Sequence, residues 1–388
     1  MRARRLLIVG AGPVGLAAAL GCARRGMEAF VLEREAVGAT LRRWGPTRLF
    51  SPMSMNLASG AAELLPARWP PDAILTGPQF ADDVLEPLAA SPPLAGRVLL
   101  RHRVAGVARA GITRGDFAGH PLRAERPFRL LVETPEGERW MEADAVLDAS
   151  GTYSQPVAVG SGGLPAPGEG ALASRIVRDL GTLADRRPAL AGRRVLLAGH
   201  GHSAANAILV LEELAREAPA TRVLWAVRTA NLRPCVEVAS DPLPERQRVV
   251  SRANQLAARP PEWLQVERRA SVESLTAAAD GTIRVGLSAG HTAPVDHLVS
   301  LTGYRPDLSF LSELALEISP SSEGAARLTA ALSRVTDCLS VPAVSAADLA
   351  SGEPGFHLIG AKSYGRARTF LLKSGYAQLE TILDGLTA

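Results

Sequence analysis

The chain has 388 residues, 47% of them hydrophobic, and 36 glycines, which is natural for two domains with packed cores and excludes a low-complexity disordered chain. The formal net charge of +4 comes from 43 lysines and arginines against 39 aspartates and glutamates, spread along the chain. This distribution does not point to a nucleic acid partner, because phosphate-bearing cofactors are enough to use several of the arginines.

A glycine-rich turn follows the first apolar run. The run Leu6–Val9 leads directly into Gly10-x-Gly12-x-x-Gly15, and a second apolar run ends at Glu33 about twenty residues later. Gly10 permits a tight strand-to-helix turn, Gly12 lets backbone N–H groups reach a pyrophosphate, and Gly15 lets helix and strand pack closely. The helix N-terminus favours phosphate, and Glu33 can accept hydrogen bonds from an adenosine ribose. The pattern predicts a dinucleotide-binding unit.

The same region admits a second interpretation, as a signal peptide or membrane span. Residues 6–23 are apolar or small, but four glycines and Pro13 interrupt them. Cleavage of this segment as a signal peptide, or its insertion into a membrane, would also leave Glu33 and its strand without a function. No other stretch is long and apolar enough to span a bilayer, so we expect a soluble, cytoplasmic protein.

A short buried-type strand and a hinge come next. Ala145–Asp148 is followed by the small residues Ala149, Ser150 and Gly151, and the stretch 160–170 is rich in glycine and proline. Such a composition is typical of a turn region, and we expect a hinge between domains here.

A second nucleotide turn appears halfway along the chain. Val195–Ala198 leads into Gly199-x-Gly201-x-x-Ala204, a helical run and a strand that ends at Val227. Val227 takes the place that Glu33 has in the first unit, and Arg228 follows it. Losing the acid and gaining a guanidinium suits a 2′-phosphate, so we expect NADPH rather than NADH.

The expected 2′-phosphate clamp is Arg228, with Arg233 as a second candidate, and the alternative is that Arg228 is a solvated loop residue. His200 and His202 lie close enough to suggest a metal pair, but no further ligand lies at metal spacing. We therefore expect no metal, and interpret both histidines as phosphate neighbours or polar turn residues.

The rest of the chain predicts a discontinuous first domain. Residues 298–307 repeat the pattern of an apolar strand broken by a small-Gly turn and mark the return from the second domain. Residues 356–360 form a further strand and 369–386 a helix. We expect an α/β fold with two Rossmann-like dinucleotide-binding domains, in which residues 161–293 are inserted between residues 1–160 and 294–388.

These two turns, the two small-Gly strand ends and the C-terminal strand-to-helix return resemble the two-dinucleotide-binding-domain flavoproteins over nearly the whole chain. That superfamily includes thioredoxin and glutathione reductases, class B flavin monooxygenases and amine N-hydroxylases. The resemblance implies FAD extended along the first turn, NADPH at the second, and hydride transfer to the flavin. Two sets of contacts are implied. For FAD they are Gly10, Gly12, Pro13, Val14, Gly15, Glu33, Arg34, Arg42, Trp44, Val104, Ser150, Gly151, Gly303 and Ser363, and for NADPH Gly199, Gly201, His202, Ser203, Ala204 and Arg228.

Cysteine usage separates the branches of this superfamily. A redox disulfide needs two sulfurs that can come within ~2 Å, yet the chain has only Cys22, Cys235 and Cys338, with no CxxC or CxxxxC spacing. Cys22 falls in the first helix as a packing residue, while Cys235 stays open as a lone thiol in the cofactor cleft. Without a dithiol, reduced flavin must pass electrons to a substrate, an external acceptor or oxygen.

Three residues are catalytic candidates within the resemblance. The stretch 41–56 lies where monooxygenases of this group place flavin-facing residues, and Asn56 is the nearest match to the Asn that helps hold their hydroperoxyflavin. Lys362 and Tyr364 follow the strand 356–360, and a lysine near the flavin pyrimidine ring could stabilise negative charge on the reduced isoalloxazine. The alternatives to a role at the cofactor are that Trp44 and Phe50 are core aromatics and that Lys362 and Tyr364 are solvated loop residues.

We therefore expect a divergent NADPH-reduced FAD monooxygenase, acting through a flavin hydroperoxide on a small soft nucleophile (a sulfur, nitrogen or arsenic centre) or a ketone. The sequence departs from class B monooxygenases, because the F-x-G-x-x-x-H-x-x-x-Y/F element before the second turn is absent. The alternatives are a flavin reductase feeding a quinone or protein acceptor and a regulatory nucleotide-binding protein. The expected partners are a small-molecule substrate and molecular oxygen, with a homodimer left open.

Overall fold

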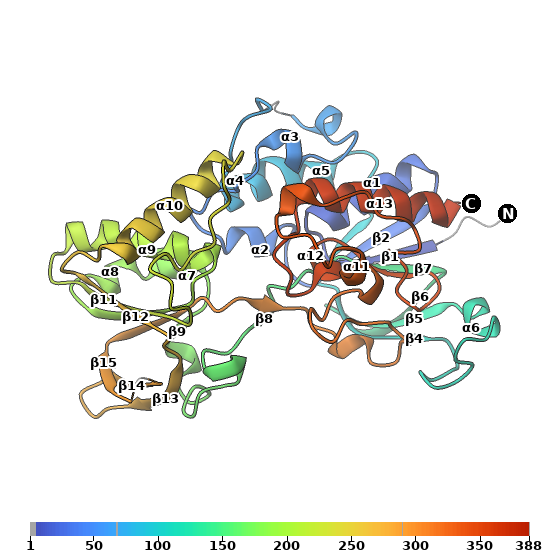
Figure 1. Cartoon of the computed structure of the whole chain (residues 1–388). Helices are drawn as coiled ribbons and strands as arrows, with labels where there is room; N and C mark the ends of the chain where they lie inside the picture. The colour runs from blue at the N-terminus through green and yellow to red at the C-terminus, as the bar shows by residue number, and fades with distance from the viewer. Residues whose placement is uncertain (1–4, 67–68, 289, 388) are drawn as a thin grey trace.

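The computed structural model describes residues 5–66, 69–288 and 290–387. In Figure 1 the blue N-terminal and red C-terminal elements share one body, while the green and yellow middle of the chain builds the other. The first domain is therefore assembled from both ends of the sequence, as the resemblance implies. Among the described residues, no helix has both the length and the apolar character to cross a membrane.

The first domain is built on a parallel five-stranded sheet in the order β18-β7-β1-β2-β3. Its strands are β1 (Arg5–Val9), β2 (Glu28–Glu33), β3 (Val98–Leu100), β7 (Ala145–Asp148) and β18 (Phe356–Leu358). The central strand β1 is an unbroken apolar run because both faces of the sheet are covered, and Leu6, Leu7 and Ile8 have no exposed surface. Beside the sheet lies an antiparallel sheet of β4 (Arg103–Arg109), β5 (Phe128–Thr134) and β6 (Gly137–Ala143).

Two long helices of the first domain pack against each other (Figure 1). They are α1 (Pro13–Arg24), which follows the glycine turn, and α13 (Leu372–Thr387) at the C-terminus. A Cβ on Gly21 would lie only 2.5 Å from Cδ1 of Leu383, so the small residue lets the helices approach closely. This packing explains why α1 is apolar on nearly every side rather than on one stripe.

The second domain has its own parallel five-stranded sheet, in the order β12-β11-β10-β16-β9. The strands are β9 (Ile176–Val177), β10 (Arg194–Ala198), β11 (Arg222–Val227), β12 (Leu264–Arg268) and β16 (His297–Ser300), with the helices α9 (His202–Glu217) and α10 (Pro244–Ala258). A small antiparallel sheet joins them, made of β13 (Val272–Ala277), β14 (Ile283–Leu287) and β15 (Thr292–Val295).

The two chain crossings between the domains run side by side. β8 (Gln155–Pro156) leads out and β17 (Tyr304–Arg305) leads back, and they pair antiparallel. The expected division at residue 293 falls before β16, yet β16 pairs with β10 in the second sheet. By strand pairing, the chain leaves the second domain only after Ser300, because the strand predicted to open the return completes the second core.

Short helices fill the connections. They are α2 (Ala39–Arg42), α3 (Met53–Asn56), α4 (Gly77–Phe80), α5 (Glu86–Ala90), α6 (Leu122–Glu125), α7 (Leu180–Asp185), α8 (Arg187–Leu190), α11 (Ala326–Ala331) and α12 (Ala361–Tyr364), with single tighter or wider turns η1 (Ala62–Leu64), η2 (Ala81–Leu85), η3 (Ser161–Gly163), η4 (Ala173–Arg175), η5 (Ser309–Leu311) and η6 (Cys338–Ser340).

Candidate functional site

The first glycine turn has a different constraint at each glycine. Gly10 has φ +99°, a conformation that side chains rarely adopt, and its Cβ would stand 3.0 Å from the Ala149 carbonyl oxygen. A Cβ on Gly15 would lie 1.9 Å from the Gly10 oxygen. In contrast, nothing lies within 4 Å of a Cβ built on Gly12. Packing therefore requires Gly10 and Gly15, whereas Gly12 keeps the space in front of the turn open.

The open space faces unpaired backbone donors. Gly12 is the N-cap of α1 without a side-chain cap, and Pro13 and Val14 open the helix, so the first-turn N–H groups have no side-chain partner. At the end of β2, the Glu33 carboxylate accepts hydrogen bonds of 2.8 Å from the backbone nitrogens of Ala11 and Glu35. These bonds fix the carboxylate beside the turn.

The ammonium group of Lys362 is buried among polar partners, which rules out the solvated-loop alternative, while a role as a charge near the flavin stays a prediction. The side chain is fully buried, and Nζ lies 2.8 Å from Oδ2 of the equally buried Asp148. Nζ also donates to Oγ of Ser150 at 2.8 Å and to the Asp307 carbonyl at 2.6 Å. Through this ion pair and these two hydrogen bonds, Lys362 ties the end of β7 to the loops after β17 and β18.

The side-chain amide of Asn56 also forms hydrogen bonds within the protein. Asn56 is buried at the end of α3, where Oδ1 accepts from Ser51 Oγ at 2.7 Å and Nδ2 donates to the Ser51 carbonyl at 2.8 Å. Its own carbonyl accepts from the hydroxyl of Tyr376 on α13 at 2.9 Å. Asn56 therefore closes a loop and anchors it to α13, and its expected catalytic role stays a prediction.

Two further expected site residues, Tyr364 and Ser363, form hydrogen bonds within the C-terminal part of the chain. Tyr364 is buried, and its hydroxyl accepts from Nε2 of Gln378 at 2.7 Å, which joins α12 to α13. Ser363 is also buried and donates from Oγ to the Gly360 carbonyl at 2.8 Å. Both side chains bond to neighbours in sequence or on α13, and their expected contacts with cofactor or substrate stay predictions.

The cofactor contacts expected between β2 and β4 differ in how free their side chains are. Arg42 donates to the Val37 carbonyl and to the carboxylates of Asp82 and Glu86, so its guanidinium is engaged within the protein. The guanidinium of Arg34 is exposed and lies 3.2 Å from the Glu35 carboxylate. Val104 is buried in β4, where its backbone pairs with Val132. The 102–104 segment nevertheless lies near Glu33, because the His102 nitrogen donates to the Glu33 carbonyl at 2.9 Å.

The second glycine turn has the same strand–turn–helix arrangement as the first, with Ala204 in place of the third glycine. Gly199 has φ +122°, and its Cβ would stand 2.3 Å from the Leu301 carbonyl oxygen, so the strand end after β16 passes directly behind it. Gly201 is the N-cap of α9, and a Cβ built on it would meet nothing within 4 Å, so the space in front of this turn is open. The third position tolerates a methyl group, since Ala204 is buried without strain.

Positive charge surrounds this second turn. Arg228 is exposed directly after β11, and among the described residues it makes no ion pair or hydrogen bond. Burial, followed by the charges of Arg228 and Arg368, lowers the pKa of His200. Arg233 differs, because it pairs with Glu237 at 3.1 Å.

Arg368 is a residue that sequence analysis missed. It belongs to the loop between α12 and α13 of the first domain, yet its charge also lowers the pKa of His202 on the second turn, after burial and Arg246. Arg368 is exposed, and its guanidinium forms no ion pair or hydrogen bond among the described residues. No motif marks it, because its position follows from how the two domains meet.

Residues 43–50 make several contacts across the domain junction. The Gly181 nitrogen on α7 donates to the Arg43 carbonyl at 2.8 Å, and a Cβ on Gly45 would lie 2.8 Å from the Gly181 Cα. Phe50 packs edge-on against His202, with ring centroids 5.2 Å apart. The segment expected to face a flavin thus also touches the second turn.

The three cysteines lie in separate places and form no disulfide: Cys22 in α1, Cys235 in the loop after β11, and Cys338 in η6. Burial raises the pKa of Cys22 and of Cys235 to about 12. Cys338 is buried against Arg246, whose Nη1 lies 3.0 Å from the sulfur, and burial raises its pKa as well. None of these thiols is a ready nucleophile at neutral pH.

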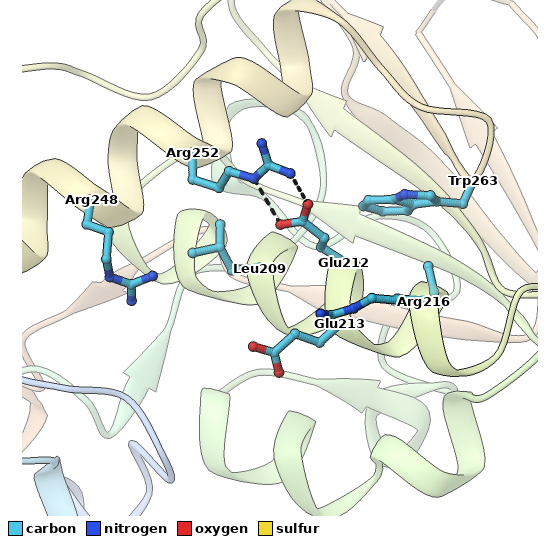
Figure 2. A pocket seen from close by; sticks show the side chains of 8 residues that line it. Leu209, Glu212, Glu213, Arg216, Arg248, Arg252 and Trp263 are labelled. Carbon is cyan, nitrogen blue, oxygen red and sulfur yellow. Dashed lines mark hydrogen bonds and ion pairs between the residues drawn. The ribbon is translucent and has the colours of Figure 1, made fainter.

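A groove of about 610 Å³ opens on the surface of the second domain between α9 and α10 (Figure 2). Figure 2 shows the carboxylate of Glu212 paired with Arg252 across it, with Trp263 beside them. Glu212 lies ten residues beyond His202 on α9, roughly 15 Å along the helix. The groove is therefore separate from the second nucleotide turn.

Comparison with known proteins supports the same architecture. Residues 7–68 match the family model described as pyridine nucleotide-disulphide oxidoreductase, and no curated protein matches the chain. Bacillithiol disulfide reductase from Bacillus cereus aligns with 18% identity and a TM-score of 0.68, over 100% of this chain and 99% of that one.

Two oxygen-using enzymes align as fully. A flavin-containing monooxygenase from Stenotrophomonas maltophilia has 19% identity and a TM-score of 0.63, over 100% of this chain and 99% of the other. An ornithine N-hydroxylase from Kutzneria has 18% identity and a TM-score of 0.64, over 99% of both chains. At such identities the likeness shows the fold.

Proposed function

We propose that this chain, whose fold is that of the two-dinucleotide-binding-domain flavoproteins, is an FAD-dependent, NADPH-reduced monooxygenase. The substrate would be a small soft nucleophile with a sulfur, nitrogen or arsenic centre, or a ketone. One oxygen atom goes to the substrate and the other to water, with NADPH supplying the electron pair. The observation that carries the proposal is a pair of open nucleotide turns in a chain without a dithiol.

The residues around the first turn fit FAD. A Cβ would meet nothing within 4 Å at Gly12 or at Gly151, so backbone can approach a ligand on both sides of the turn. The unpaired N–H groups at the start of α1 suit a pyrophosphate, and the fixed Glu33 carboxylate retains lone pairs for ribose hydroxyls. When bound there, FAD would supply the two-electron redox chemistry that the side chains lack.

The residues around the second turn fit NADPH. Open backbone at Gly201 and the N-terminus of α9 would hold the pyrophosphate. The unpaired guanidinium of Arg228 would bind the 2′-phosphate through charge-assisted hydrogen bonds. Arg368 adds positive charge from the first domain and would help to hold the nucleotide against the junction.

The cysteines favour oxygen or a small acceptor over a disulfide as the oxidant. A thiol mechanism needs a thiolate, and the raised pKa values keep Cys22 and Cys235 protonated at neutral pH. The likeness to a flavin-containing monooxygenase and an N-hydroxylase supports oxygen chemistry on this fold. The contact of residues 43–50 with the second domain would help exclude water from the reacting atoms.

The decisive experiment measures NADPH oxidation and oxygen consumption by the purified yellow protein, with and without a panel of sulfides, amines, arsenite and ketones. We expect one substrate class to raise oxygen consumption and to suppress hydrogen peroxide release. A protein that gains no flavin from added FAD would refute the proposal at its first step.

The second candidate is a flavin reductase that passes electrons to a quinone or a protein acceptor. Its support is the accessible aromatic surface at the domain junction, where Tyr153 is 38% exposed next to Trp44. Efficient anaerobic turnover with a water-soluble quinone, combined with no substrate-dependent oxygen consumption, would favour this candidate.

A further inference from the structure

An irregular segment of the first domain reaches the second domain. Residues 333–348, which we call the strap, follow α11; the structure describes all of them, and η6 is their one regular element. Val335, Val341 and Val344 pack partly against the core of the first domain. Cys338 is the one buried residue of the strap, and its sulfur faces a side chain of the second domain.

Arg246 of α10 is the residue that receives the strap. Its side chain is 5% exposed, and Nη1 lies 3.0 Å from Cys338 Sγ and 3.1 Å from Asp337 Oδ2. The turn is fixed locally, because Asp337 Oδ1 accepts from the Leu339 nitrogen at 2.9 Å and the Asp337 carbonyl accepts from the Ser340 nitrogen at 3.1 Å. The strap therefore presents two acceptors to one nitrogen of the guanidinium.

The other nitrogens of Arg246 are bonded within the second domain. Nε and Nη2 donate to the two carboxylate oxygens of the buried Asp241 at 2.6 and 2.8 Å. A buried cation without a partner is strongly destabilising, but Asp241 compensates this charge whether or not the strap is docked. The strap adds one further ion pair and a contact to sulfur, which is a weak acceptor. Docking can therefore be reversed without leaving Arg246 unpaired.

The docked strap lies near the second glycine turn. Burial lowers the pKa of His202, the first residue of α9, and the charge of Arg246 acts in the same direction, whereas Asp241 and Asp337 oppose it. Phe50 of the first domain packs edge-on against the same ring, with centroids 5.2 Å apart. The strap and Phe50 are thus two separate parts of the first domain that approach this turn.

The covalent connection between the domains leaves their orientation to such contacts. The two crossings, β8 and β17, are two residues long and pair antiparallel with each other. A short two-stranded pair is marginally stable by itself, so it does not hold two domains at a fixed angle. Side-chain contacts across the junction must therefore set the orientation of the second domain.

We propose that the strap is a reversible clamp on the second domain: docked on Arg246 it fixes the orientation of that domain against the first, and undocked it releases it. The inference goes beyond the proposed function, because it concerns how the domains are held and not the reaction. Asp337 and Arg246 are positioning residues in this arrangement, since neither belongs to a nucleotide turn.

The test compares Asp337→Asn with the native full-length protein by hydrogen exchange and small-angle X-ray scattering, neither of which needs turnover. Asparagine keeps the oxygen that accepts from Leu339 but places an NH₂ group against the Arg246 guanidinium, so the strap should undock. The amides of residues 338–340 should then exchange about tenfold faster, and the radius of gyration should rise.

Asp348→Asn is the matched control, because it makes the same substitution within the strap. The Asp348 carboxylate accepts from the Ser345 nitrogen at 2.9 Å and from the Ser345 hydroxyl at 2.6 Å, and forms no ion pair with the second domain among the described residues. This variant should keep the native exchange at residues 338–340 and the native scattering. Cys338→Val removes only the sulfur acceptor and should speed exchange in the same direction by a smaller factor.

Two outcomes would overturn the inference. Equal exchange at residues 338–340 in Asp337→Asn and Asp348→Asn would show that Arg246 does not hold the strap. Faster exchange with unchanged scattering would show that the strap does not fix the second domain.

A kinetic measurement connects the strap with the proposed function. In the Asp337→Asn holoenzyme, flavin reduction at saturating NADPH should slow about tenfold while the Kd for NADP⁺ stays within about threefold of the native value, because orientation changes and nucleotide contacts do not. A native reduction rate would overturn the positioning role of Asp337. A native protein that NADPH does not reduce would instead overturn the proposed function and leave the exchange and scattering comparison intact.

Discussion

The two glycine turns share a backbone plan and differ in how the polar groups around them are bonded. Around the first turn, Glu33 is held by two backbone N–H groups, and the Lys362–Asp148 pair is fully buried next to Ser150. Around the second turn, Arg228 and Arg368 are exposed cations without an ion pair among the described residues. The polar groups around the first turn are bonded within the protein, whereas the two arginines near the second turn are unpaired.

This difference predicts different ligand behaviour. A site whose groups are already fixed loses little conformational entropy on binding, so it suits a ligand that stays bound. A site whose long side chains order only when the ligand arrives suits a ligand that exchanges, and its affinity depends on salt. We therefore expect FAD to copurify with the chain and NADPH to bind and leave within each turnover.

The largest effect is expected from Gly15→Val. Since even a Cβ would lie 1.9 Å from the Gly10 oxygen, the branched side chain should prevent the turn from forming and leave no folded, flavin-containing protein. The control is Gly12→Ala, which has open space, should fold, and should only weaken FAD binding. Flavin absorbance and circular dichroism measure both. A yellow, folded Gly15→Val protein would contradict the packing role of Gly15.

Lys362→Met should have the next largest effect, a loss of stability. It leaves the buried Asp148 carboxylate unpaired, which costs on the order of 3–5 kcal/mol of unfolding free energy. The exposed Lys373→Met is the matched control and should change stability by less than about 0.5 kcal/mol. Denaturant unfolding measures both variants. If Lys362→Met were as stable as the control yet lost flavin reduction, the result would support the predicted role of Lys362 at the cofactor and contradict a purely structural one.

Arg228→Ala tests the free charges of the second turn. Loss of a charge-assisted contact of about 1.5–3 kcal/mol should weaken NADPH binding roughly ten- to hundredfold and leave NADH binding nearly unchanged. Arg233→Ala is the control, because Arg233 already pairs with Glu237 and is 60% exposed. Arg368→Ala should weaken both nucleotides if it faces the pyrophosphate. Equal use of NADPH and NADH by the native protein would contradict the assignment of Arg228.

The smallest effect concerns pH. Burial and the neighbouring arginines lower the pKa of His200, so the ring is neutral at pH 7 and gains its proton only at a pH below the usual histidine range. That proton adds positive charge beside the diphosphate, so NAD⁺ affinity should rise about two- to fivefold as the pH falls below that range. NAD⁺ is used because it lacks the titrating 2′-phosphate. His200→Gln should abolish the slope, and an unchanged slope would place His200 away from the diphosphate.

Much of the fold could be predicted because it depends on local chemistry. A glycine turn between an apolar strand and a helix is encoded within about fifteen residues, and the three glycine roles assigned to Gly10, Gly12 and Gly15 agree with the observed φ values and contacts. The predicted helix at 369–386 corresponds to α13, Leu372–Thr387. Periodicity and turn residues carry such information without reference to the rest of the chain.

Side-chain roles were less predictable, because residue type does not say which partner a side chain will find. Asn56, Lys362 and Tyr364 have the chemistry of catalytic groups, and in the folded chain their polar atoms contact Ser51, Asp148 and Gln378. These partners lie 5, 214 and 14 residues away, respectively. Only folding brings Asp148 and Lys362 together, and burial then makes their pairing obligatory.

By itself the sequence determined two dinucleotide-type turns, a discontinuous first domain and the lack of a dithiol, since each follows from short patterns or from counting. The tertiary structure alone decided which charges remain free and what lies between the turns. Arg368 and Tyr153 carry no motif, and their proximity to the second turn and to Tyr304 arises from the way the paired crossings orient the two sheets. Contacts between distant segments depend on packing that no local pattern encodes.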